Sequence, residues 1–314
     1  MTDFIDVTTP LLRDWALPMP PEDGDKDERG RVLIIGGSRE MPGACMLAVV
    51  AALRAGAGKV CVATGASVAP LVAQAIPEAR VIGLRESDDG GLLPKEVDRL
   101  PTEFDAVLIG PGMQDEEVVS AFVAAVLPRF ASAKIVLDAT AMSIVLQDGA
   151  RAGGAFRFVS PVVLTPHAGE MAHLTGKSKD SICDHPQAAA VAAAADWNAT
   201  VALKGATTFI ATPAAQVWRH TGGSVGLAIS GSGDTLAGII VGLASRGASL
   251  EQASVWGVAL HARAGVALEQ RMGPLGFLAR EISGEVPRLM RDLGSKASAH
   301  VKAGLCESST TTSG

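Results

Sequence analysis

The chain has 314 residues, of which 48% are hydrophobic, 19% charged and only 4% aromatic, with no tyrosine. This composition excludes a disordered chain and fits tightly packed layers of helix and sheet better than a nucleic-acid-binding platform. The formal net charge of -6 argues against binding of polyanions by bulk electrostatics, so any phosphate ligand has to be held locally.

The cysteines and the N-terminal segment indicate a cytoplasmic protein. The four cysteines lie far apart and form no C-x-x-C pair, which favours free thiols in a reducing compartment. The first residues, MTDFIDVTTPLLRDW, carry acids where a signal peptide needs basic residues followed by an apolar run. Apolar runs such as 41–53 are too short to cross a bilayer, so we expect no membrane-spanning segment.

Short apolar runs alternate with helical patterns after a polar, proline-rich lead-in over residues 1–29, which we expect to be partly ordered. This alternation is typical of a parallel sheet. Strands are predicted at 31–37, 57–63, 79–84, 104–109, 134–137, 162–164 and 200–203, with a hairpin over 209–211 and 216–218. Helices are predicted at 41–54, 69–75, 116–130, 187–197, 235–246, 250–270 and 281–293. No repeat or linker divides the chain, so we expect one domain over 30–295 and a disordered tail over 296–314.

Six unusual loops follow or adjoin the predicted strands. In an open parallel sheet the carboxyl ends of the strands share one edge, where ligands bind, so these loops are expected to form one composite site. They are 36–44, 110–114, 138–140, 165–170, 204–208 and 231–234. The glycines of the first loop do not have the G-x-G-x-x-G spacing, so a Rossmann coenzyme site is not favoured.

The last loop, G-S-G-D, combines a turn of small residues with an acid at the start of the apolar helix predicted from Thr235. Its backbone N–H groups and the positive end of the helix dipole suit a phosphoryl group in transfer, and Gly231, Ser232 and Gly233 are the predicted anion hole. Asp234 is then the catalytic base that takes a proton from an attacking hydroxyl. An ordinary helix cap is an equally good interpretation of these four residues alone.

Taken together, the loops resemble the ADP/ATP-dependent NAD(P)H-hydrate dehydratase family, a branch of the ribokinase-like fold. The resemblance covers residues 30 to 290 and rests on an ordered set of motifs. They are GGSREMPGA (36–44), GPG (110–112), DAT (138–140), TPHAGEM (165–171), LKGATT (203–208) and GSGDTLAGI (231–239).

The resemblance implies an α/β, three-layer fold with a mostly parallel central sheet and helices on both faces. It also implies repair of NADH or NADPH hydrated at the nicotinamide ring (NADHX and NADPHX), in which ADP or ATP phosphorylates the ring hydroxyl and phosphate then leaves. Hydroxide is a poor leaving group, and phosphorylation makes it a good one. The resemblance assigns the hydrated dinucleotide to Ala44, Gly112, His167 and Asp234. It assigns the adenosine nucleotide to Lys204, Gly205, Ala206, Thr207, Thr208 and Gly233.

Three further side chains near this edge each allow two interpretations. Glu170 either orients a hydrated Mg²⁺, which the nucleotide requires, or caps the helix expected to begin at Met171. Asp138 is either a partner of the site residues or a turn residue, and His167 without the family motif would be structural. The remaining loop and helix histidines fit no ligand spacing and are treated as incidental, namely His173, His185, His220 and His261.

Several positions depart from the usual pattern of the family. They are Gln114, Thr140, Ser143, Ala168, Val225, Ile229 and Ser230. The last two precede Gly231 where Thr-Gly is usual, which motivates the second of two alternative functions. One is a ribokinase-like kinase of a vitamin or sugar alcohol, and the other is an inactive nucleotide-binding sensor. We also expect a homo-oligomer, such as a tetramer, and a separate NAD(P)HX epimerase as functional partner.

Overall fold

The computed structural model describes residues 3–20, 25–147 and 156–294. These residues form a sheet with the strand order β1-β10-β9-β8-β7-β6-β5-β2-β3-β4. The strands are β1 (Ile5–Asp6), β2 (Arg31–Ile35), β3 (Lys59–Gly65), β4 (Ala79–Leu84), β5 (Ala106–Ile109), β6 (Lys134–Leu137), β7 (Val162–Leu164), β8 (Ala199–Leu203), β9 (Thr207–Ala211) and β10 (Val217–Thr221). All pairings are parallel except those of β9, which runs antiparallel to both β8 and β10. The mostly parallel sheet predicted from the sequence is confirmed.

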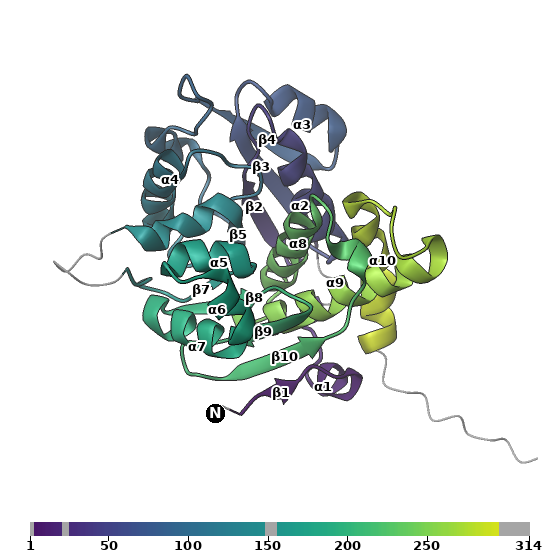
Figure 1. The fold of residues 1–314 in the computed structure, drawn as a ribbon. Helices are drawn as coiled ribbons and strands as arrows, with labels where there is room; N and C mark the ends of the chain where they lie inside the picture. Colours follow the sequence, from purple (N-terminus) through teal and green to yellow (C-terminus); the bar gives the residue numbers. More distant parts are fainter. Residues whose placement is uncertain (1–2, 21–24, 148–155, 295–314) are drawn as a thin grey trace, which may run out of the picture.

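Helices cover both faces of the sheet and make a three-layer molecule (Figure 1). The α-helices are α1 (Thr9–Asp14), α2 (Pro42–Arg54), α3 (Ala69–Ala75), α4 (Glu116–Arg129), α5 (Ala168–Thr175), α6 (Lys179–Asp184), α7 (Pro186–Trp197), α8 (Ser232–Ser245), α9 (Leu250–Met272) and α10 (Ala279–Gly294). Three short 3-10 helices are η1 (Pro94–Arg99), η2 (Ala139–Leu146) and η3 (Val225–Leu227). One face carries α4, α5, α6 and α7, and the other carries α2, α8, α9 and α10.

The central strand β2 shows why both faces are covered. Leu33 and Ile35 pack into the core on the α4 side, whereas Val32 and Ile34 pack into the core on the α8 side. Successive side chains of a strand point to opposite faces, so a continuous apolar run requires helices on both. On the second face, a Cβ at Gly238 would overlap the carbonyl of Ala48, so glycine lets α8 lie close against α2.

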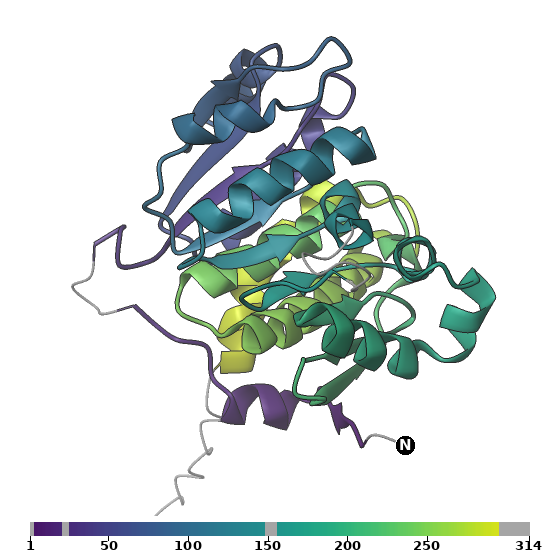
Figure 2. The same ribbon diagram turned by 90° about the vertical axis from the view of Figure 1, so that its left-hand side faces the viewer.

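The N-terminal lead-in contributes elements that the sequence analysis did not predict. β1 extends the sheet beside β10, and α1 packs next to it (Figure 1), at the opposite end of the molecule from the blue segments around β4 (Figure 2). Trp15 stacks on Trp218 with ring centroids 5.6 Å apart, and its carbonyl accepts a 2.8 Å hydrogen bond from Trp256 Nε1. These contacts attach the described part of the lead-in to the sheet and to α9.

Two predicted helix starts near the loops are wrong by one turn or less. α8 begins at Ser232 rather than Thr235, and α5 begins at Ala168 rather than Met171. In both cases the loop residues before the apolar pattern already adopt the helical conformation, which a periodicity of apolar residues does not register. The tail predicted over 296–314 lies outside the described residues. Within residues 3–20, 25–147 and 156–294, no helix is long and apolar enough to cross a membrane.

Candidate active site

The six loops meet at one edge of the sheet, as predicted. Each loop is joined to the next by a hydrogen bond or a close approach, in the order of the strands from β2 to β8 and then across to α8. The hydrogen bonds are Gly37 N–H to the Pro111 carbonyl (2.7 Å), Thr140 Oγ1 to the Met113 carbonyl (3.0 Å), Thr165 Oγ1 to Asp138 Oδ1 (2.6 Å) and Lys204 N–H to the Pro166 carbonyl (2.8 Å). The composite site predicted from strand order is therefore present as a continuous set of loops.

The turn before α8 is built from glycines for a steric reason. Gly231 has φ 88°, a left-handed conformation that other residues adopt only with strain. The N–H of Ser232 donates to the carbonyl of Ile229 at 3.3 Å, so this member of the predicted anion hole is already engaged. The N–H of Gly233 has no partner among the hydrogen bonds of the described residues, and it remains available to an anion at the start of the helix.

Lys204 places its ammonium group over this turn. A Cβ built on Gly233 would lie 3.4 Å from Lys204 Nζ and touch no other heavy atom within 4 Å. The end of β8 and the first turn of α8 therefore present a positive side chain and a free backbone N–H to the same small space. Two such groups suit a phosphoryl oxygen better than any neutral ligand.

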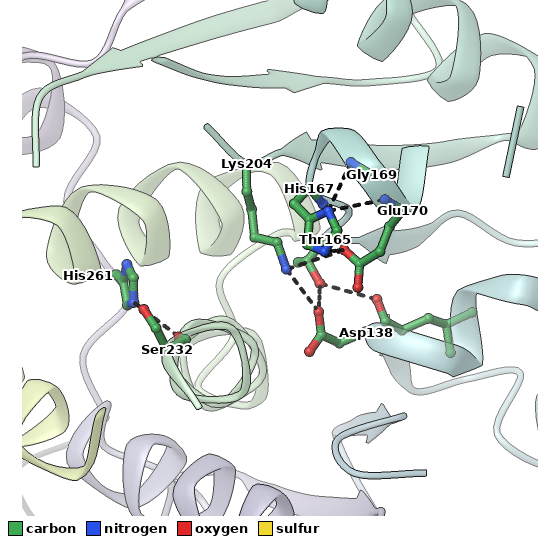
Figure 3. Close-up of polar contacts among 9 residues, drawn as sticks. Asp138, Thr165, His167, Gly169, Glu170, Lys204, Ser232 and His261 are labelled. Atoms are coloured by element: carbon green, nitrogen blue, oxygen red, sulfur yellow. Dashed lines mark hydrogen bonds and ion pairs between the residues drawn. The ribbon is translucent and has the colours of Figure 1, made fainter. Parts of the chain in front are cut away.

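The carboxylates of Asp138 and Glu170 hold the other side of Lys204 (Figure 3). Lys204 Nζ lies 3.4 Å from Asp138 Oδ1 and 3.8 Å from Glu170 Oε2, and the Asp138 side chain is only 4% exposed. Burial acts against the charged ammonium, but the attraction of these two carboxylates outweighs it and raises the pKa of Lys204. The interpretation of Asp138 as a mere turn residue is wrong, because it is a buried partner of Lys204 and Thr165.

Asp234, in the first turn of α8, has a carboxyl group with a raised pKa. Burial, together with the negative charge of Asp138, raises its pKa from 3.8 to about 6, although Lys204 acts in the opposite direction. Its charge is also felt at Cys45, just after the first loop, because burial and, second, the negative charge of Asp234 raise the pKa of the Cys45 thiol to about 12. A carboxylate with a pKa near 6 is ionised at neutral pH and still basic enough to accept a proton from a reacting group.

His167 and Glu170 form a capping box at the start of α5. His167 Nδ1 accepts the N–H groups of Gly169 (3.0 Å) and Glu170 (3.1 Å), and Glu170 Oε2 accepts the N–H of His167 at 2.8 Å. Both residues thus have the structural role that the sequence analysis weighed as an alternative. Because Nδ1 accepts, the proton of the neutral imidazole is on Nε2, which lies 3.6 Å from Glu170 Oε2, and the side chain is 59% exposed.

The other predicted binding residues lie around these groups. Gly112 and Ala44 are neighbours, since a Cβ at Gly112 would come within 2.8 Å of the Ala44 Cβ. In the loop after Lys204, Gly205 and Ala206 are exposed, and Thr208 Oγ1 lies 3.3 Å from the Gly205 carbonyl and closes the turn. Thr207 is half-buried in the first position of β9.

His261, which the sequence analysis treated as incidental, contacts a member of the predicted anion hole. From the middle of α9 its Nε2 lies 3.0 Å from Ser232 Oγ and 3.1 Å from the Ser232 carbonyl, at the first residue of α8 (Figure 3). Burial lowers its pKa from 6.5 to about 4, so it is neutral at physiological pH. A histidine in an apolar helix gives no sequence signal for such a contact, because its partner is 29 residues away.

Two cavities lie near these elements. One, of about 210 Å³, is next to the site and is lined by Glu170, Thr140, Ser143 and His173, among others. The other, of about 550 Å³, lies against α6, α7 and Phe209 and contains none of the predicted site residues. We therefore consider the smaller cavity relevant to the chemistry, because it opens beside Glu170 at the carboxyl edge of the sheet.

The three-layer fold, with a glycine turn and a carboxylate at the start of α8, is that of the ribokinase-like proteins. The family model described as NAD(P)H-hydrate dehydratase matches residues 32–288. An ADP-dependent (S)-NAD(P)H-hydrate dehydratase of Xanthomonas campestris pv. campestris is 48% identical over 286 residues, which cover 90% of this chain and 95% of that protein. The chain belongs to the NAD(P)H-hydrate dehydratase family.

Two further similarities place this chain within the family. The crystal structure of an ADP/ATP-dependent NAD(P)H-hydrate dehydratase from Bacillus subtilis, co-crystallised with ATP/Mg²⁺, has a TM-score of 0.80 and 30% identity and covers 93% of this chain and 100% of that one. A bifunctional NAD(P)H-hydrate repair enzyme of Moorella thermoacetica is 36% identical over 292 residues. The match covers 92% of this chain but 54% of that protein, so this chain spans about half the length of the bifunctional relative.

Proposed function

We propose that this protein restores NADH and NADPH from their hydrated forms by transferring the terminal phosphoryl group of ADP or ATP to the ring hydroxyl. Asp234 takes the hydroxyl proton as the oxygen attacks phosphorus, and the carbon–oxygen bond then breaks as phosphate leaves with the former hydroxyl oxygen. A proton lost from the neighbouring ring carbon restores the double bond. The observation that carries the proposal is the convergence of the Lys204 ammonium, the free Gly233 N–H and the basic carboxylate of Asp234 at the start of α8.

The nucleotide is proposed to lie against Lys204 to Thr208 with its phosphates over Gly233. Lys204 is already held by Asp138 and Glu170, so its ammonium needs little reorganisation when a phosphate arrives. Such a preorganised charge stabilises the phosphoryl group in transfer more than a mobile surface lysine does. The donor is ADP or ATP, because each carries a terminal phosphoryl group that can be transferred to the hydroxyl, with AMP or ADP as the leaving group.

The hydrated dinucleotide is proposed to bind across Ala44, Gly112 and His167, with its ring hydroxyl at Asp234. Support comes from the close approach of Gly112 to Ala44 and from the electrostatic coupling of Asp234 to Cys45, the residue after Ala44. His167 uses Nδ1 at the helix start, so its Nε2, 3.6 Å from Glu170 Oε2, is the ring nitrogen that would contact a ligand. The substrate and the nucleotide therefore approach the same turn from neighbouring loops.

Mg²⁺ is proposed as the metal that accompanies the nucleotide. Within the described ranges, no group of three or more His, Cys, Asp or Glu side chains is arranged to hold a metal ion. This fits Mg²⁺, which binds mainly to nucleotide phosphates and water and needs only one or two carboxylates. Glu170, whose side chain is 26% exposed, is the residue that would hold it, through a water. When bound, the ion neutralises charge on the phosphates.

We further propose a cytoplasmic location, a homo-oligomeric state such as a tetramer, and a separate NAD(P)HX epimerase as functional partner. The free thiols of Cys45, Cys61 and Cys183 support a reducing compartment. The name of the Moorella relative, a bifunctional NAD(P)H-hydrate repair enzyme, supports a second repair activity that works with this one.

The test is to incubate the protein with hydrated NADH, Mg²⁺ and either ADP or ATP, and to measure whether the absorbance of the dihydronicotinamide ring returns. Recovery with at least one nucleotide and release of inorganic phosphate is the expected result. Formation of a stable phosphorylated product from a vitamin or sugar alcohol, without recovery from the hydrate, would favour the kinase. Nucleotide binding without any turnover would favour the inactive sensor.

A further inference from the structure

A partly buried contact behind the proposed anion-binding turn has no place in the chemistry described so far. His261, from the middle of α9, reaches the first residue of α8 with Nε2 3.0 Å from Ser232 Oγ and 3.1 Å from the Ser232 carbonyl. In Figure 3 this pair lies on the opposite side of the first turn of α8 from Lys204 and Asp138. His261 therefore does not face the ligand edge, and it acts on the turn from behind.

The direction of these hydrogen bonds follows from their chemistry. A carbonyl oxygen only accepts, so His261 Nε2 carries a proton and donates it to the Ser232 backbone, with Ser232 Oγ as a second acceptor. Burial lowers the pKa of His261 to about 4, although the hydrogen bond to the Ser232 backbone acts in the opposite direction, so the ring is neutral at physiological pH. The contact is therefore a fixed hydrogen bond between two helices.

On the N-terminal side of Ser232 the turn has few hydrogen bonds of its own, which makes the contact from His261 relevant. Ser232 N–H makes one long bond of 3.3 Å to the Ile229 carbonyl, and Gly231 before it has left-handed backbone torsions. Thr235 Oγ1 holds the Gly231 carbonyl at 3.0 Å. Without His261, nothing among the described side-chain contacts fixes Ser232 itself, and the orientation of the Gly233 N–H one residue later depends on it.

We propose that His261 is a positioning residue for phosphoryl transfer, which holds the Ser232 backbone so that the Gly233 N–H points at the transferred group. The inference rests on the proposed function, because it concerns the same turn. A misplacement of a catalytic donor by a fraction of an ångström lowers the rate of a preorganised reaction with little effect on substrate binding. The effect is therefore expected in kcat rather than in KM.

The experiment compares His261→Leu, which removes the donor, with His261→Gln, whose Nε2 amide occupies nearly the place of the imidazole Nε2. We expect His261→Leu to lower kcat about 10- to 100-fold with KM for hydrated NADH within about threefold, and His261→Gln to recover most of kcat. His185→Leu, at an exposed histidine between α6 and α7, is the control for the same chemical change and should keep wild-type kcat. If the leucine variant does not fold, His261→Asn replaces it, because its shorter amide does not reach Ser232.

A second readout separates this inference from the proposed function. Amide hydrogen exchange of the 229–236 segment in the apo protein is expected to speed up in His261→Leu and to return to the wild-type rate in His261→Gln. Absence of dehydratase activity in the wild type would reject the proposed function, while the exchange rates would still decide the role of His261. Equal exchange in all three proteins, or the same kcat for leucine and glutamine, would overturn the positioning role.

Discussion

Asp234→Asn is expected to stabilise the protein while it abolishes most of the activity. The carboxylate is held with a pKa of about 6 instead of 3.8, so between these values the folded state binds protons that the unfolded state has already lost. The free energy of unfolding contributed by this group therefore falls as pH rises from about 4 to about 6. At neutral pH the folded state bears the full cost of keeping the Asp234 carboxylate ionised. Each pKa unit corresponds to about 1.4 kcal/mol, which gives an upper bound of about 3 kcal/mol.

Partial exposure to solvent reduces this figure, so we expect the asparagine variant to gain about 1 to 2 kcal/mol at pH 7.5 and nothing below pH 4. Asparagine keeps the shape of the side chain and its ability to accept a backbone N–H at the start of α8. The control is Asp196→Asn, an exposed residue near the end of α7, which should change stability by less than about 0.5 kcal/mol.

The measurement is urea unfolding followed by tryptophan fluorescence at several pH values, combined with steady-state kinetics. We expect turnover of Asp234→Asn to fall by about two to four orders of magnitude, the usual contribution of a positioned base. In the wild type, kcat/KM should rise with pH and level off above about 6, because the base has to be ionised. A stability gain that is the same at pH 4 and pH 7.5, or turnover near the wild-type rate, would refute the assignment of Asp234.

Three further changes test the surroundings of this residue. Lys204→Met should weaken nucleotide binding about 10- to 100-fold in calorimetry, because a charge-assisted hydrogen bond to phosphate is lost. Lys177→Met, at an exposed position, is the control and should bind the nucleotide as the wild type does. Equal affinities of the two variants would contradict the role of Lys204 in phosphate binding. Gly233→Ala should fold with a melting temperature within about 3 °C of wild type, because its methyl group meets only Lys204 Nζ. It should lower kcat at least about tenfold, because the methyl group fills the space proposed for the anion. An unchanged kcat would place the phosphate elsewhere. Removal of residues 2–20 should lower stability by about 2 to 4 kcal/mol in urea unfolding, because Trp218 loses its cover; an unchanged midpoint would show that the lead-in does not support the fold.

The sequence by itself determined the layered fold and the edge at which the site lies. The alternation of apolar runs such as 31–35 and 134–137 with helical patterns predicted the parallel sheet, and the resemblance of the loop motifs to the dehydratase family implied helices on both faces. Because parallel strands end at one edge, the loops after them were expected to meet, and they do. The G-S-G-D turn was recognisable because left-handed torsions at a helix start require glycine.

Only the tertiary structure decided what each polar side chain does within that edge. Asp138 and Lys204 are 66 residues apart, and His261 and Ser232 are 29 apart, so no local pattern relates them. The same holds for the lead-in, whose short apolar pattern becomes β1 and α1 only because Trp218 and Trp256 present a surface for it. Backbone conformation follows from neighbouring residues, whereas the protonation and orientation of a buried side chain follow from the groups that folding brings to it.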